Sequence, residues 1–244
     1  MTENGTVRLL HISDLHFGSP FLPAVADALL QKLRQISADA VIVSGDFTQR
    51  ARTREFEAAA RFLKLLPDVP RLVIPGNHDV PLYRVIERLF RPLDGYRRHI
   101  SDELNPVLQL NGAVIVGLDS TSPYRNITNG RICRWQLDRC ADLFQSAPPG
   151  AARIVVTHHA LVPGPGHGAN VVMPKAGRAV DRFLESGVEM VLSGHLHYTY
   201  TTSLKDAIPE SCRERDLTIV QCGTSTSRRG RGREQGKNSF NLIE

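Results

Sequence analysis

The sequence predicts an α/β fold in which parallel strands alternate with covering helices, and three observations support this. Short runs rich in Val, Ile and Leu recur along the chain and have the length of buried strands. Segments with apolar residues at helical spacing separate the first three of these runs. Each of these strands is followed by a turn that carries carboxylate, amide or imidazole side chains. Parallel strands joined by crossover helices end at the same edge of a sheet, so we expect the polar turns to share one edge.

The first half of the chain supplies this parallel core. The expected strands are residues 7–13, 39–44 and 71–75, and the expected helices between them are residues 23–35 and 54–66. The turns that follow the strands read Asp14-Leu15-His16, Gly45-Asp46 and Gly76-Asn77-His78-Asp79. Residues two apart in an extended segment share a face, so we expect Asp14 and His16 to point at one ion. Gly76 lacks a Cβ atom, and we expect a sharp turn of the backbone there.

The second half of the chain starts a second sheet. Asn111-Gly112 lies between apolar runs at 107–110 and 113–118, which is typical of a β-hairpin. We expect a helix over 134–144, in which Trp135, Leu137 and Phe144 make apolar contacts. Strands at 152–157 and 188–193 end at His158-His159 and at Gly194-His195-Leu196-His197. Residues 198–204, 217–222 and 240–243 are expected to complete this second sheet, so that two packed sheets are flanked by helices.

Two segments do not fit this regular pattern. Residues 81–100 contain Tyr83, Ile86, Leu89 and Phe90 at helical spacing before Arg91-Pro92, and we expect a partly helical insertion beside the strand ends. Residues 161–173 are rich in glycine and proline and carry His167 and Asn170. We expect this second segment to form a loop over the same edge of the sheets.

The composition is that of an ordinary globular protein. The chain has 244 residues, of which 41% are hydrophobic and 23% charged. We expect residues 1–244 to form a single domain, with 203–244 as a C-terminal strand-rich segment of that domain. No apolar run is long enough to cross a bilayer and no leader pattern precedes the first strand, so we expect a cytoplasmic protein without membrane contact. The four cysteines show no C-x-x-C pairing and are expected to be reduced.

The polar strand ends are candidate metal ligands. The side chains concerned are Asp14, His16, Asp46, Asn77, His78, His158, His195 and His197. Seven of these side chains, all except His78, would be too many ligands for one ion and about right for two ions that share a bridging ligand. The absence of cysteine among them disfavours a structural zinc site, and the mixture suits manganese, iron or zinc. If these were instead unrelated polar turns, five such turns would have to follow five apolar strands by chance.

Taken together, the motifs resemble the signature of the calcineurin-like metallophosphoesterases. The matching motifs, from residue 7 to about 197, are Asp14-Leu15-His16, Gly45-Asp46, Gly76-Asn77-His78-Asp79, His158 and Gly194-His195-Leu196-His197. The chain length and the His158-His159 pair resemble the bacterial class III cyclic nucleotide phosphodiesterases. The resemblance implies a four-layer αββα sandwich of two mixed sheets. It also implies hydrolysis of phosphodiester bonds, such as those of cyclic nucleotides or related small phosphodiesters, by a hydroxide bridging two divalent or mixed-valence metal ions (Mn, Fe or Zn).

The resemblance also implies a role for each residue. Asp14, His16 and His197 would hold the first metal, and Asn77, His158 and His195 the second. Asp46 would bridge both metals. His78 would lie near the oxygen of the leaving group, and Asp79 would orient His78.

The charge of the chain leaves the substrate class open. The net charge is +5 and the sequence pI is about 9.2, which favours anionic ligands. Five cations crowd the stretch 228–237: Arg228, Arg229, Arg231, Arg233 and Lys237. This stretch is either a solvated loop or the phosphate-binding surface of a nuclease, and an aromatic content of only 6% disfavours nucleic acid as the partner.

The same residues are compatible with a phosphomonoesterase or a protein phosphatase, because loops around the strand ends, rather than the metal ligands, select the substrate. A non-enzymatic scaffold that keeps the fold is disfavoured by the complete set of ligand-type residues. The oligomeric state is open, and a homodimer is one option.

Overall fold

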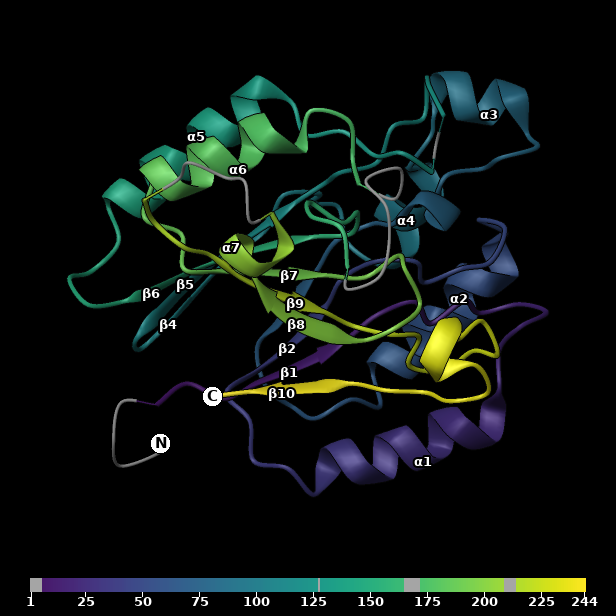
Figure 1. The fold of residues 1–244 in the computed structure, drawn as a ribbon. Helices are drawn as coiled ribbons and strands as arrows, with labels where there is room; N and C mark the ends of the chain where they lie inside the picture. The colour runs from purple at the N-terminus through teal and green to yellow at the C-terminus, as the bar shows by residue number, and fades with distance from the viewer. Residues whose placement is uncertain (1–5, 127, 165–171, 209–213) are drawn as a thin grey trace.

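The computed structural model describes residues 6–126, 128–164, 172–208 and 214–244. Its strands form two sheets (Figure 1). The first sheet contains, in spatial order, β10 (Asn241–Ile243), β1 (Leu9–Ile12), β2 (Ala40–Val43) and β3 (Arg71–Val73). The second contains β4 (Val107–Leu110), β5 (Ala113–Leu118), β6 (Ala152–Thr157), β7 (Met190–Ser193), β9 (Thr218–Gln221) and β8 (Tyr200–Ser203). Strands β1, β2 and β3 are parallel, as expected, and β5, β6, β7 and β9 form a parallel core in the second sheet as well.

Helices cover the outer faces of the two sheets. The helices are α1 (Pro23–Arg34), α2 (Thr53–Leu63), α3 (Val85–Phe90), α4 (Asp94–His99), α5 (Arg134–Gln145), α6 (Ala176–Glu185) and α7 (Leu204–Ala207). Helix α1 lies against the first sheet, and α5 and α6 lie against the second, on the opposite side of the molecule (Figure 1). The four-layer αββα sandwich is therefore confirmed. No helix within the described ranges is both long and apolar enough to cross a membrane.

Alternation along the strands builds three apolar cores. In β2, Val41 and Val43 face the helices, whereas Ile42 packs in the layer between the sheets. In β5, Val114 packs toward α5 and α6, and Ile115 meets the residues of the first sheet. Because every central strand is buried on both faces, its sequence reads as a continuous apolar run. Each strand leaves the apolar core where its apolar run ends, and its polar turn begins at that residue.

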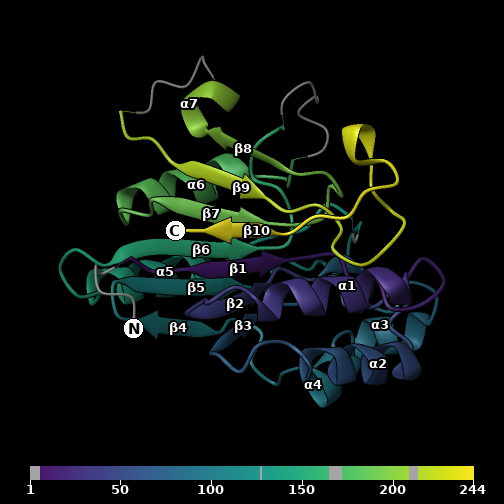
Figure 2. The same ribbon diagram turned by 90° about the horizontal axis from the view of Figure 1, so that it is seen from below.

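Two expectations about the packing are wrong. Residues 240–243 were expected in the second sheet, but β10 pairs antiparallel with β1 in the first sheet, with Leu9 opposite Ile243 (Figure 2). The order of strands along the chain does not reveal which free sheet edge a final strand joins. Trp135 is 57% exposed rather than packed, because Leu137, Cys140 and Phe144 define the buried face of α5 and Trp135 lies away from it.

The insertion after the third strand forms two short helices, with the expected break at Arg91-Pro92 between α3 and α4. The apolar side chains of α3 face solvent: Ile86 is 77% exposed and Phe90 is 78% exposed. His167 and Asn170, which were expected on a loop over the strand ends, lie outside the described residues.

Candidate metal centre

The strand-end turns of the two sheets meet: His158 Nδ1 donates to Ser44 O at 2.8 Å, and His195 N–H donates to Asp14 Oδ2 at 2.9 Å. Further hydrogen bonds join the turns within each sheet. The backbone N–H groups of Asp14 and His16 donate to the carbonyl oxygens of Gly45 and Asp46, at 3.1 and 3.0 Å. In the second sheet, Gly194 N–H donates to His158 O at 3.1 Å. The side chains that follow β1, β2, β6 and β7 are therefore held in register.

The backbone at these turns is left-handed rather than extended. The φ angles are 54° at Asp14, 50° at His16, 55° at Asp46, 77° at His195 and 61° at His197. Asp14 and His16 do point into one cluster, but the expected reason, a shared face of an extended strand, is wrong. The chain turns sharply at each of these residues, a conformation that is uncommon for a side chain with a Cβ atom and that occurs mostly where function requires it.

A first group of four buried side chains converges. One ligand atom from each of Asp14, His16, Asp46 and His197 lies within 4.8 Å of the others. His16 Nε2 is 3.0 Å from His197 Nε2, and Asp14 Oδ1 is 3.0 Å from His197 Nε2. Asp46 Oδ2 is 3.6 Å from His16 Nε2.

A second group lies on the other side of Asp46. His158 Nε2 is 3.4 Å from Asp46 Oδ1 and 3.1 Å from Asn77 Oδ1. His195 Nδ1 is 2.9 Å from the same oxygen of Asn77. The two oxygens of Asp46 thus face different groups: Oδ2 faces the first and Oδ1 the second.

The hydrogen bonds around the site show which ring nitrogens carry lone pairs. A carbonyl oxygen only accepts, so His158 Nδ1 must donate to Ser44 O at 2.8 Å, and His197 Nδ1 must donate to Arg229 O at 3.1 Å. In each neutral ring this leaves Nε2 with a lone pair, and both Nε2 atoms point at carboxylate oxygens. Within the described part of the chain, Asp14 Oδ1 and Asp46 Oδ2 have no hydrogen-bond partner. Acceptors that face acceptors in a buried site require positive charge between them, so the residues present fit metal cations.

Protons and metal ions compete for this site. Burial opposes charge on His158, but the Asp46 carboxylate outweighs it and raises the pKa of His158 to about 9. Burial alone would raise the pKa of Asp46, yet the neighbouring His158 and His78 imidazoles lower it well below its usual range. The site is thus arranged to keep its carboxylates ionised and to attract cations.

Gly76 acts differently from what we expected. Its backbone is extended, with φ −113° and ψ 179°, so there is no sharp turn at this residue. A Cβ atom at this position would collide with the carboxylate and backbone nitrogen of Asp46, and would lie 2.9 Å from Asp46 Cγ. Glycine is therefore needed so that Asp46 can approach the 3₁₀ turn η1 (Asn77–Asp79).

His78 lies beside the cluster, and a backbone carbonyl orients its ring. His78 Nδ1 donates to Gln49 O at 2.9 Å, and the ring packs edge-on against His16 with the centroids 4.8 Å apart. The expectation that Asp79 orients His78 does not match these contacts. The Asp79 carboxylate instead accepts from the backbone N–H groups of Phe47, Thr48 and Gly76, which fixes the turn after β2 against η1.

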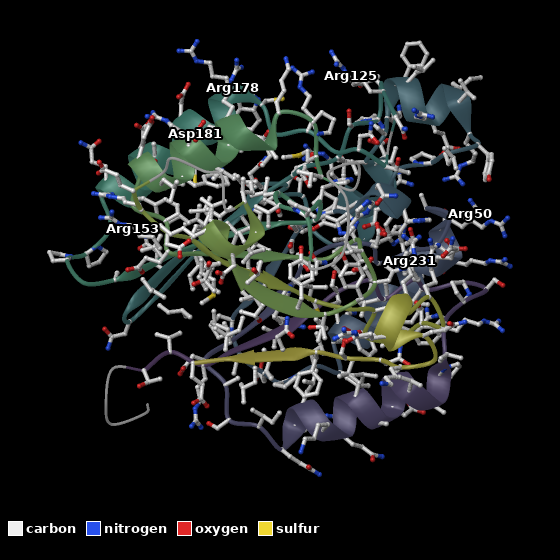
Figure 3. All side chains as sticks on the ribbon, viewed as in Figure 1. Arg50, Arg125, Arg153, Arg178, Asp181 and Arg231 are labelled. Carbon is white, nitrogen blue, oxygen red and sulfur yellow. The ribbon has the colours of Figure 1, made fainter. Side chains whose placement is uncertain are left out.

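Arg229 reaches the site from the arginine-rich stretch, and the sequence did not single it out. Its guanidinium donates to Gln49 Oε1 at 2.9 Å, while its backbone carbonyl accepts from His197. Burial lowers the pKa of Arg229, and the negative charges of Asp46 and Asp14 oppose that shift. Of the five cations in the stretch, Arg229 is therefore the one that these contacts place beside the site. Arg50 and Arg231, labelled in Figure 3, lie on the same side of the molecule.

A cavity of about 210 Å³ opens beside the candidate ligands. Asn77 and His78 line one end, and Arg50, Arg88 and Arg125 are among the residues around it. Three cations thus line the cavity, so an anionic group would be attracted into it.

Comparisons with known proteins agree with this description. Residues 7–199 match the family model of the calcineurin-like phosphoesterases. A protein of Rhodococcus erythropolis named "probable cyclic nucleotide phosphodiesterase" is 29% identical over 255 residues, which cover 97% of this chain and 80% of that protein. A protein of Arcobacter nitrofigilis named "probable glycerophosphodiester phosphodiesterase" is 30% identical over 177 residues, which cover 67% of this chain and 58% of that protein.

Solved structures share the fold at low sequence identity. A dimetal phosphatase from Danio rerio superposes with a TM-score of 0.63 at 13% identity, over 97% of this chain and 91% of that one. A purple acid phosphatase from yellow lupin seeds superposes with a TM-score of 0.66 at 12% identity, over 98% of this chain and 47% of that one. The fold of this chain is thus shared with proteins of low sequence identity.

Proposed function

The chain belongs to the calcineurin-like phosphoesterase family, and we propose on this basis that it is a metal-dependent hydrolase of phosphodiester bonds. The substrate class is small phosphodiesters, with cyclic nucleotides as one case. The names of the two relatives from Rhodococcus and Arcobacter support the preference for diesters. The cationic side chains around the cavity support an anionic substrate.

The two groups of donors would hold two metal ions. Asp14, His16 and His197 would bind the first, and Asn77, His158 and His195 the second. The observation that carries this assignment is Asp46, whose Oδ2 faces His16 at 3.6 Å and whose Oδ1 faces His158 at 3.4 Å. A carboxylate placed in this way can bridge two cations. The nitrogen and oxygen donors suit manganese, iron or zinc. When bound, such cations would act as Lewis acids on the phosphoryl group and make water more acidic.

The remaining residues of the site would position the substrate and move a proton. His78 would donate a proton to the oxygen of the leaving group. Its Nδ1 is held by Gln49 O, so the proton would leave from Nε2. Burial lowers the pKa of His78, and an anionic phosphate bound beside it would raise that pKa again, so that the ring would be protonated when substrate is present. Arg229, whose guanidinium donates to Gln49 Oε1, would add positive charge beside the site.

A pair of model substrates tests the proposal. Bis-p-nitrophenyl phosphate is a diester and p-nitrophenyl phosphate is a monoester, and both release the same coloured product. We expect hydrolysis of the diester to stop after treatment with chelator, to return with Mn²⁺, and to exceed that of the monoester at least tenfold in kcat/KM. Undiminished activity in protein shown to be metal-free would refute the metal requirement, and a preference for the monoester would refute the diester assignment.

A further inference from the structure

A second cavity, of about 280 Å³, lies between the segment that precedes α5 and the start of α6. Five cationic side chains line it: Arg125, Arg131, Arg134, Lys175 and Arg178. Among the described residues that line this cavity, none is acidic. We call it the basic pocket. In Figure 3, Arg125 and Arg178 lie along the same upper edge of the molecule.

The cations of the basic pocket are available to a ligand. All five side chains are exposed. Only Arg134 has a carboxylate nearby, Asp138 at 3.7 Å, whereas Arg125, Lys175 and Arg178 form no ion pair with any residue that the structure describes. Leu137, Met173 and Ala179 form part of the lining and are buried, so the cations surround an apolar floor. A cavity with these features is suited to a small group that carries a phosphate, because its volume of about 280 Å³ lies just below the range typical of whole-ligand sites, roughly 300–1,000 Å³.

The basic pocket adjoins the cavity at the metal centre. Arg125 and Asn126 line both cavities, so the cavity lined by Asn77 and His78 and the pocket lined by Lys175 and Arg178 lie on either side of these two residues. A substrate that reaches past Arg125 and Asn126 would contact both cavities.

The segment that follows β5 is hydrogen-bonded to the turn after β6, which carries the candidate ligand His158. Ser120 Oγ is 2.8 Å from His159 Nδ1 and accepts from the backbone N–H of His158 at 3.3 Å. Gly130, with φ +68°, lines the basic pocket and lies so close to the His159 ring that a Cβ atom would collide with it. The segment that carries Arg125 and Arg131 is thus packed directly against the turn after β6.

We propose that the substrate is a phosphodiester that carries a second phosphate, and that the basic pocket binds this second phosphate while the metal centre holds the diester. This inference rests on the proposed function of the metal centre. A substrate without the second phosphate would still react, but it would bind more weakly. The geometry favours a group that is part of the substrate over a separate anion, because the two cavities share their lining at Arg125 and Asn126.

Two variants on one helix separate the basic pocket from general charge effects. Arg178 lines the pocket, whereas Arg182, one turn later on α6, lies outside it and pairs with Asp138 and Glu185. Arg178→Gln and Arg182→Gln therefore make the same change of charge on the same helix. Lys175→Gln is a second variant within the pocket, should the first fail to fold.

The first measurement is calorimetric binding of inorganic pyrophosphate to chelator-treated protein. We expect saturable binding that Arg178→Gln and Lys175→Gln each weaken about tenfold, the effect of one lost charge-assisted contact, and that Arg182→Gln leaves unchanged. Absence of binding, or equal weakening by Arg178→Gln and Arg182→Gln, would overturn the assignment of the pocket.

The second measurement compares two diesters with Mn²⁺ present: the p-nitrophenyl ester of thymidine 5′-phosphate, and the same ester with a 3′-phosphate. We expect the 3′-phosphate to lower KM about tenfold, and Arg178→Gln to remove that advantage without changing KM for the simpler ester. Hydrolysis of both esters with equal KM would overturn this inference and leave the proposed function intact, even if pyrophosphate binds, because the pocket would then hold a separate anion. Hydrolysis of neither ester would overturn the proposed function itself.

Discussion

Replacing Gly76 by alanine would push the Asp46 carboxylate out of its place between the two donor groups. The new Cβ atom would lie 2.9 Å from Asp46 Cγ, whereas carbon atoms in contact are ordinarily about 3.5–4.0 Å apart. Asp46 or the η1 turn must therefore move by about 0.6–1.1 Å. Metal and catalytic sites require ligand positions within about 0.5 Å, so the displacement is large enough to disturb both groups at once.

We expect Gly76→Ala to lose at least one of two bound metal equivalents and to lower kcat/KM by at least about 10²-fold. Metal content is measured by elemental analysis after dialysis against limiting Mn²⁺, and turnover is measured with bis-p-nitrophenyl phosphate. Gly117→Ala is the matched control, because its Cβ atom would lie 2.7 Å from Ile74 Cγ2, inside the core between the sheets. It should cost stability, about 1–3 kcal/mol, without loss of metal. Two retained equivalents and a kcat/KM within threefold of wild type in Gly76→Ala would refute this reasoning.

Three further outcomes are expected. Asp46→Asn should remove both metals, whereas His16→Ala should leave one partly bound; equal and mild losses in metal analysis would contradict the bridging role. His78→Ala should keep both metals but slow hydrolysis about 10²–10⁴-fold for an alkoxide leaving group and less for nitrophenolate; equal slowing of both would show that His78 is not a proton donor. Burial raises the pKa of Asp119 to about 6, so the folded state loses stability as pH rises from about 4 to about 6. The free energy of unfolding of Asp119→Asn, measured with urea, should therefore rise relative to that of wild type by up to about 3 kcal/mol between pH 4 and pH 7. A difference between the two proteins that does not change with pH would contradict this.

The sequence predicts the meeting of the strand ends because that outcome follows from topology alone. Once the runs that contain Ile12, Val43 and Val73 are parallel neighbours, the turns after them must share an edge. The same reasoning could not place β10, because a short final strand can pair with any free edge and its apolar content is the same in each case. It also could not foresee the contact of Arg229 with Gln49, which joins residues 180 positions apart through a turn of no regular structure.

The orientation of single side chains and the conformation of single residues were also predicted wrongly from the sequence. Asp79 looked like an orienting carboxylate because it follows His78 directly, yet the 3₁₀ turn directs it back toward the N–H groups of Phe47 and Thr48. Gly76 looked like a turn residue, and its neighbour in space, Asp46, shows that it is a site of close approach instead. Both differences arise where side chain and backbone positions depend on a second strand, which no local pattern contains.

The left-handed residues at the strand ends have a consequence for engineering this protein. Each non-glycine residue in that conformation costs about 1 kcal/mol, so Asp14, His16, Asp46, His195 and His197 together cost several kcal/mol, against a total stability of about 5–15 kcal/mol for a typical domain. Glycine would relieve that cost at any of the five positions. A screen for heat resistance in metal-free buffer should therefore select glycine at these turns. The selected variants would have higher thermal stability but would no longer bind metal. Thermostable variants that still hydrolyse substrate should be sought with metal present throughout selection.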